Sequence, residues 1–200
     1  MLNLPLSVRQ IAGPLIVLFI SWTLFLIGPV GYDLLAYERE LVTHQQWWRL
    51  ITGNFLHTNL NHLLLNSAGV ALLWALHGQY FAIKTYLVYV LLLCTLTTLG
   101  IYGFAPQLHW FVGLSGALHG LFILGAYCDI RCGLKSGWLL LVGVLAKVVH
   151  EQIWGASQDI ATLIDAKVAI DAHLFGSLAG LLLIVLLNCK TWLLYRLAKK

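Results

Sequence analysis

The stretch GLSGALHG, residues 113–120, opens an apolar segment and sets one serine, Ser115, among small and apolar residues. A serine hydroxyl is a weak nucleophile until a neighbouring base takes its proton. His119 follows one helical turn later on the same segment, where it is poorly placed to receive that proton. The stretch therefore predicts a reactive serine only if other segments bring a base and hydrogen-bond donors to it.

The composition around this stretch is that of a membrane protein. Hydrophobic residues make up 60% of the 200 residues and charged residues only 10%, with a mean hydropathy of +0.84. Soluble domains carry about 25% charged residues, so we predict an all-α, polytopic membrane protein with no large soluble domain. The formal charge of +4 comes from basic residues scattered near segment ends and does not suggest a nucleic-acid partner.

Six apolar segments are candidate membrane helices, and we expect them to form a single domain over residues 1–200. They cover about residues 14–30, 62–76, 83–104, 114–128, 137–154 and 171–189. A polar stretch at 31–61 and a polar loop at 155–170 lie between them. We expect the second of these loops to act as a flexible cap.

Six spans put both termini on one side of the membrane. If that side is cytoplasmic, it receives most of the basic residues, as the positive-inside rule requires. It holds Arg9, Lys84, Arg131, Lys135, Lys190, Arg196, Lys199 and Lys200, against Arg39, Arg49 and Lys167 on the other face. We therefore predict cytoplasmic termini, with the even-numbered spans starting at the outer face.

Unusual polar residues lie near those outer starts. They are His62 and Asn66 on the second span, Ser115 on the fourth and His173 on the sixth. Polar groups at membrane depth are candidates for function because each is costly unless it lines a wet cavity. The fourth span also has about 15 residues, or roughly 22 Å of helix, against a hydrocarbon core of about 30 Å. Ser115 is therefore expected inside the membrane, within reach of water.

Small residues spaced by four mark two helix faces that can pack closely in lipid. The two sets are Gly116 with Gly120, and Ala172 with Gly176 and Gly180. Packing these faces together brings Ser115 towards His173. The two side chains then suit a nucleophile and a general base in acyl transfer.

A third catalytic member is not obvious from the sequence. Asp171 is two residues from His173 and points elsewhere on a helix, so a dyad is the simpler prediction. The backbone N–H of Ser115, with His62 and Asn66 on one helical face, are candidate donors to an oxyanion.

Two other functions fit part of the pattern. Histidines within the spans suit a haem site, with His62, His119, His150 and His173 as candidate ligands, although this leaves Ser115 and Asn66 unexplained. A proton or ion pathway is suggested on the fifth span by Lys147, His150 and Glu151. Lys147 and Glu151 are four apart, however, and can simply pair with each other.

Four motifs occur together over nearly the whole chain. They are Gly113-x-Ser115-Gly116, His57-x4-His62-x3-Asn66, Trp48-Arg49 and Ala172-His173-x2-Gly176-x3-Gly180. In combination they resemble the rhomboid family of intramembrane serine proteases. The resemblance implies a six-helix bundle in which Ser115 is the nucleophile and His173 the general base.

The resemblance also implies roles around that pair. His62, Asn66 and the backbone at Gly113 and Ser115 would stabilise the oxyanion. His57 would belong to the hydrogen bonding of the first loop, and Trp48 and Arg49 would brace that loop. The implied substrate is a single-span membrane protein, cut near its outer boundary after entering between the second and fifth spans. Neither metal nor cofactor is expected, and the implied location is a bacterial inner membrane.

One position departs from the common pattern. Many rhomboids have a tyrosine four residues after the nucleophile, where this chain has His119, for which we favour a packing or tuning role. The compact length, the Gly-x-Ser-Gly-x-x-His-Gly form and the His150-Glu151 pair are similar to the rhombosortase branch, and His150 and Glu151 are therefore expected to support the site. The implied substrates of that branch end in Gly-Gly, a hydrophobic helix and a basic tail. An inactive rhomboid-like protein that binds membrane clients is the remaining alternative.

Overall fold

The computed structural model describes the backbone of residues 4–197 and the side chains of residues 4–188. The predicted cytoplasmic residues of the tail, Lys190, Arg196, Lys199 and Lys200, lie outside the described side chains.

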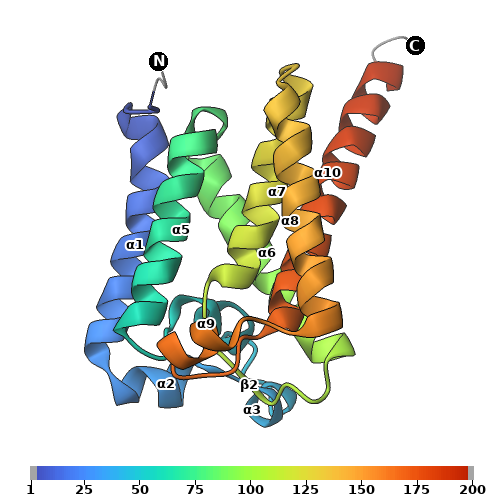
Figure 1. Cartoon of the computed structure of the whole chain (residues 1–200). Coiled ribbons are helices and arrows are strands. Elements are labelled where there is room, and N and C mark those ends of the chain that lie inside the picture. Colours follow the sequence, from blue (N-terminus) through green and yellow to red (C-terminus); the bar gives the residue numbers. More distant parts are fainter. Residues whose placement is uncertain (1–3, 198–200) are drawn as a thin grey trace.

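Within the described backbone, six long helices form a bundle, which confirms the all-α fold class (Figure 1). They are α1 (Val8–Ile27), α5 (Leu60–His77), α6 (Ile83–Phe104), α7 (Ser115–Arg131), α8 (Lys135–Trp154) and α10 (Ile170–Leu197). Helix α7 is central, because α5, α6, α8 and α10 all pack against it. The start of α1 and the far end of α10 lie at the same end of the bundle, and the longer loops gather at the opposite end.

The loop end contains short elements that periodicity could not reveal. They are α2 (Pro29–Leu35), β1 (Tyr37–Glu38), α3 (Arg39–Thr43), α4 (Arg49–Thr52), η1 (Gly53–Phe55), β2 (Trp110–Phe111) and α9 (Gln158–Leu163), with η2 (Gly78–Tyr80) at the other end. Strands β1 and β2 pair antiparallel, so the first polar stretch is joined to the segment that leads into α7.

Two arginines fasten this loop end. Buried Arg49 donates from Nη1 to the carbonyl of Ala36 and from Nη2 to that of Asp33, each at 2.6 Å. Arg39 donates to carbonyls in and just after the last turn of α6, where a helix leaves acceptors without partners. The first polar stretch is therefore held both to itself and to the bundle.

The predicted contact between the two small-residue faces is confirmed. A Cβ placed on Gly176 would lie 1.9 Å from the carbonyl oxygen of Gly116, and one on Gly180 would lie 2.7 Å from that of Gly120. The backbones of α7 and α10 approach as closely as glycine allows. The start of α10 is thereby held beside the start of α7.

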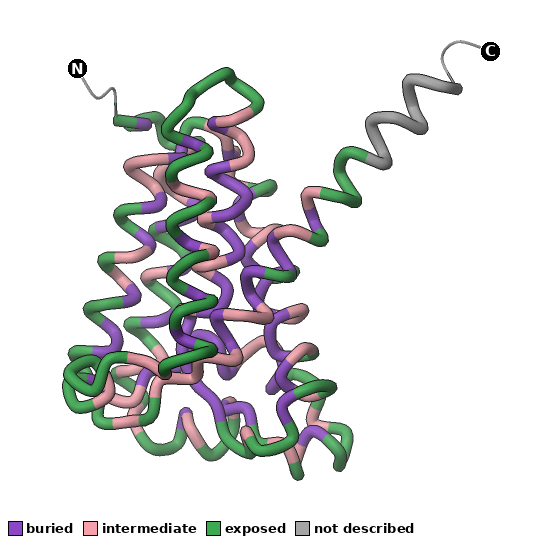
Figure 2. The backbone as a smooth tube through the Cα atoms, turned by 45° about the vertical axis from the view of Figure 1, so that its right-hand side comes forward, coloured by how far each residue is buried: buried purple, intermediate pink, exposed green. Residues whose placement is uncertain are grey.

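Four described helices, α1, α6, α8 and residues 170–188 of α10, are long and apolar enough to cross a membrane. Helix α5 carries His62 and Asn66, and α7 has only 17 residues, about 26 Å of helix. Buried residues gather inside the bundle and exposed residues lie along its outside (Figure 2). Many of the exposed residues are large and apolar. The count of six spans and the orientation of the termini stay predictions.

Candidate active site

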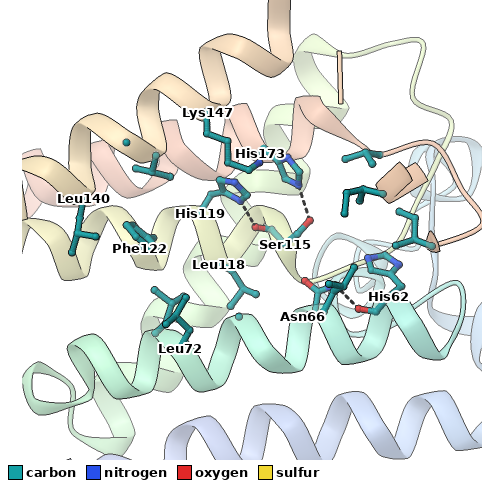
Figure 3. A pocket seen from close by; sticks show the side chains of 18 of the residues that line it. His62, Asn66, Leu72, Ser115, Leu118, His119, Phe122, Leu140, Lys147 and His173 are labelled. Carbon is teal, nitrogen blue, oxygen red and sulfur yellow. Dashed lines mark hydrogen bonds between the residues drawn. The ribbon is translucent and has the colours of Figure 1, made fainter. Parts of the chain in front are cut away.

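Ser115 and His173 meet at the loop end of the bundle. Ser115 is the first residue of α7, and His173 is the fourth residue of α10. The Oγ of Ser115 lies 2.9 Å from Nε2 of His173, within hydrogen-bond distance (Figure 3). Because Ser115 opens its helix, its backbone N–H has no acceptor within that helix and is available to a ligand.

His173 has a second partner that the sequence did not reveal. Its Nδ1 lies 2.7 Å from Oε2 of Glu151, near the end of α8. The other oxygen of Glu151 accepts a hydrogen bond of 2.6 Å from Nζ of Lys147, so the expected pair on α8 is present as well. Asp171 instead accepts from Gln107 at 2.9 Å. The carboxylate that reaches His173 is therefore that of Glu151 on α8, and not that of Asp171, which is nearer in sequence.

His119 stacks on the face of the His173 ring. The two rings are stacked with centroids 4.2 Å apart and planes 21° apart, and Nδ1 of His119 lies 2.7 Å from the carbonyl oxygen of Ser115. This contact leaves no space for a haem between the rings. The geometry fits the packing role favoured for His119.

His119, Glu151 and His173 are also a possible metal-ligand set, since one donor atom of each lies within 4.8 Å of the others. Zinc needs ligand lone pairs that converge on one point. Lone pairs of two nearly parallel rings do not converge, and Lys147 already occupies one oxygen of Glu151. The set is better suited to orienting a base than to holding an ion.

The candidate oxyanion donors line the cavity beside Ser115. Nδ2 of Asn66 donates to the carbonyl of His62 at 3.2 Å, which leaves its second N–H free for a ligand (Figure 3). Gly113 does not offer its N–H, which donates to the carbonyl of Gly53 at 3.2 Å. Its φ is +122°, and a Cβ there would lie 2.8 Å from the His62 ring. Glycine at this position leaves room for His62.

Of the remaining predicted residues, His57 and Trp48 lie in the loop end and His150 lies outside the site. His57 is buried beside His62, with ring centroids 5.0 Å apart, and its carbonyl accepts a hydrogen bond from the Tyr32 hydroxyl. Burial and neighbouring His62 lower the pKa of His57 to about 3. Trp48 donates from Nε1 to the carbonyl of Leu34 at 3.0 Å. His150, in contrast, is exposed to the outside of the bundle, where its ring packs on that of Trp154, and it does not join the site.

Two cavities meet at Ser115 and His62. The larger, about 590 Å³, lies between α5 and α8 over the face of α7, and its walls are mostly apolar side chains. The smaller, about 300 Å³, opens among the loops and is lined by residues such as Thr58, Gln107 and Lys167. The serine is therefore approached both from the side of the bundle and from its loop end.

Helix α9 covers the loop end of the larger cavity, with Ile160 and Ile164 in its wall. Three side chains at the start of α5 hold it through backbone carbonyls. Thr58 donates to that of Ile164 at 2.6 Å, and Asn59 and Asn61 donate to that of Leu163 at 3.0 and 3.2 Å. The loop expected to act as a cap does lie over the site.

Comparison with known proteins points to one family. Residues 44–189 match the family described as the rhomboid domain. The chain is also 30% identical over 145 residues to a protein of Bacillus subtilis (strain 168) named "Putative rhomboid protease YdcA". That match covers 71% of this chain and 68% of the relative.

Proposed function

Because this chain belongs to the rhomboid family, a family of multi-pass membrane proteins, we propose that it is an intramembrane serine endopeptidase with Ser115 as nucleophile. Family membership supports intramembrane protease activity. The observation that carries the serine mechanism is the 2.9 Å approach of Ser115 Oγ to His173 Nε2 at a cavity wall.

The geometry supports acyl transfer in two steps. Ser115 Oγ attacks the scissile carbonyl as His173 Nε2 takes its proton, and the proton then passes to the leaving amine as the C–N bond breaks. Water next attacks the acyl-enzyme, with His173 again as base, and Ser115 regains its proton. The smaller cavity gives this water a route to the serine from the loop end.

Negative charge on the attacked carbonyl oxygen needs donors that are already in place. The unpaired N–H of Ser115, the free N–H of Asn66 and the ring of His62 all border the cavity next to the nucleophile. We assign the oxyanion site to these three groups. Removing one such donor typically costs a factor of about 10²–10³ in rate.

The substrate we propose is a single-span membrane protein that enters between α5 and α8 and is cut near the outer face of a bacterial inner membrane. The apolar walls of the larger cavity and its place at the side of the bundle support lateral entry of an apolar segment. The Gly-x-Ser-Gly-x-x-His-Gly form supports substrates whose tail has Gly-Gly, a hydrophobic helix and a basic end.

A fluorophosphonate probe tests the nucleophile without a known substrate. We expect the probe to label the detergent-purified wild type and not Ser115→Ala, and cleavage of a single-span reporter with a Gly-Gly tail to stop in the same variant. Cleavage that continues in Ser115→Ala overturns the protease assignment. Proton-coupled transport that survives the substitution would favour the pathway through Lys147, and client binding without labelling would favour an inactive binder.

The tail preference has its own control. A reporter in which the Gly-Gly pair is replaced by Leu-Leu should be cut more slowly. Equal cleavage of the two reporters would remove the sorting tail from the proposal and leave the protease intact.

A further inference from the structure

We propose that Glu151 is a positioning residue for His173, so that Ser115, His173 and Glu151 form a triad whose acid is held by Lys147. This inference rests on the proposed function of Ser115 and His173. The four residues form an unbroken chain of contacts, with separations of 2.9, 2.7 and 2.6 Å.

The carboxylate fixes the tautomer of the histidine. An ionised carboxylate can only accept, so Nδ1 of His173 must carry the proton in its 2.7 Å contact with Glu151. Nε2 is then unprotonated and faces the Ser115 hydroxyl as an acceptor. This is the state that a general base needs before the first step, and the same carboxylate stabilises the imidazolium that forms during it.

Burial makes this orientation strong. The side chains of His173 and Glu151 are only 7% and 11% exposed, so water screens their attraction weakly. Lys147 is half exposed at 50%, and its contact to the other oxygen of Glu151 favours the ionised carboxylate. The presence of Lys147 and Glu151 on an apolar helix is thus explained by their contacts at the site, and an ion pathway is not needed to explain it.

Other polar groups around His173 do not replace Glu151. On α7, Ser115 faces Nε2 and His119 stacks on the ring; on α5, His62 lies across the larger cavity. Asp171, on α10 itself, is bound to Gln107. Glu151 is therefore the carboxylate that reaches the ring nitrogen opposite the nucleophile.

The test is the pH profile of fluorophosphonate labelling, whose acidic limb reports protonation of the base in the free enzyme. Glu151→Gln keeps the side-chain shape but removes the charge and the fixed acceptor. We expect the labelling rate at neutral pH to fall by about 100-fold, since general bases contribute roughly 10²–10⁴. The acidic limb should move to lower pH by about one unit, because the imidazolium loses its neighbouring charge.

Lys147→Met should move the acidic limb of the labelling profile in the opposite direction. It leaves the carboxylate of Glu151 without its cation, so the limb should move to higher pH, by about half a unit for a half-exposed group. Asp171→Asn is the matched control: it removes a carboxylate two residues from His173 and should leave the limb in place. A purely structural role would change thermal stability without moving the limb in either direction.

Each outcome decides the inference. Labelling that depends on Ser115, with a limb that stays fixed in Glu151→Gln, overturns the triad and leaves the protease standing. If Glu151→Gln does not fold, the upward shift in Lys147→Met carries the test, and its absence overturns the inference. A wild type that does not react at all contradicts the proposed function instead.

Discussion

Two histidine–carboxylate pairs lie at opposite ends of α7, and they differ in their access to other groups. At the loop end, His173 contacts Glu151 on one side and the Ser115 hydroxyl on the other, at the wall of a cavity. At the far end, Nε2 of His77 lies 3.3 Å from Oδ2 of Asp129, and Oδ1 of the same carboxylate accepts a 2.6 Å hydrogen bond from the Tyr80 hydroxyl.

The second pair is closed on every described side. His77 is 1% exposed, its Nδ1 has no hydrogen-bond partner among the described residues, and a Cβ on Gly125 would lie 2.2 Å from that atom. In the proposed mechanism, the same two chemical groups therefore serve different purposes. A histidine–carboxylate pair can perform catalysis where the second nitrogen faces a hydroxyl at a cavity, and elsewhere it joins helices.

The largest loss of stability that tests this contrast is expected at the His77–Asp129 pair. His77→Ala leaves the Asp129 carboxylate buried without its histidine and should destabilise the fold by about 3 kcal/mol, as removal of one member of a buried pair does. The labelling rate per folded molecule should stay within about twofold of wild type, because distant sites act independently. Thermal unfolding in detergent and fluorophosphonate labelling measure the two quantities.

His150→Ala is the control for this prediction, since it removes an exposed histidine that joins neither pair. It should change neither quantity. Loss of labelling in fully folded His77→Ala would show that the two ends of α7 are coupled.

A smaller effect is expected where α7 and α10 touch. Gly176→Ala would place a Cβ 1.9 Å from the Gly116 carbonyl oxygen, so the helices must separate. We expect a loss of about 2 kcal/mol of stability from overpacking. Labelling should fall at least about tenfold, since misplacement of reacting groups by 1 Å can cost 10²-fold.

Gly103→Ala is the matched control on α6, because a Cβ there meets nothing within 4 Å. It should keep full labelling. If Gly176→Ala also labels at the wild-type rate, the close helix contact does not set the distance between Ser115 and His173.

The third effect is expected at the loop end and only in acid. The folded pKa of His57 is about 3, against 6.5 in an unfolded chain, so the unfolded state binds more protons between these values. Its contribution to stability is therefore complete above pH 6.5 and declines as the pH falls below it, by at most about 1.4 kcal/mol per pH unit. His57→Leu should show a shallower decline than wild type in thermal unfolding between pH 6 and pH 4.

Above pH 7 the unfolding temperatures of wild type and His57→Leu should differ by a constant amount. Parallel curves down to pH 4 would mean that His57 takes up its proton without unfolding.

The sequence was informative where local patterns determine the structure. Apolar runs indicated the helices, and small residues spaced by four correctly predicted that Gly116 and Gly176 would meet. The strand pair of Tyr37 and Phe111 was missed, because two residues are too few to show alternation.

Glu151 was expected to support the site, but its contact with His173 was not predicted. Lys147, four residues earlier, is a sufficient local partner for Glu151, so this spacing gives no reason to expect a contact between Glu151 and a different helix. A signal did exist, since Glu151 lies three residues before the end of α8 and His173 three residues after the start of α10, at the same end of the bundle. Which face of α8 turns towards α10 is set by packing, and the spacing of residues along α8 does not reveal it.

Helix α9 is held over the cavity through the main-chain carbonyls of Leu163 and Ile164, which are bound by Thr58, Asn59 and Asn61. Every amino acid carries such a carbonyl, so the fastening does not depend on which side chains α9 presents to the cavity. The cap can therefore exchange its inward-facing residues, in nature or in a designed library, and still be held in place. If the chain acts as proposed, its substrate preference can change there without any change in Ser115 or His173.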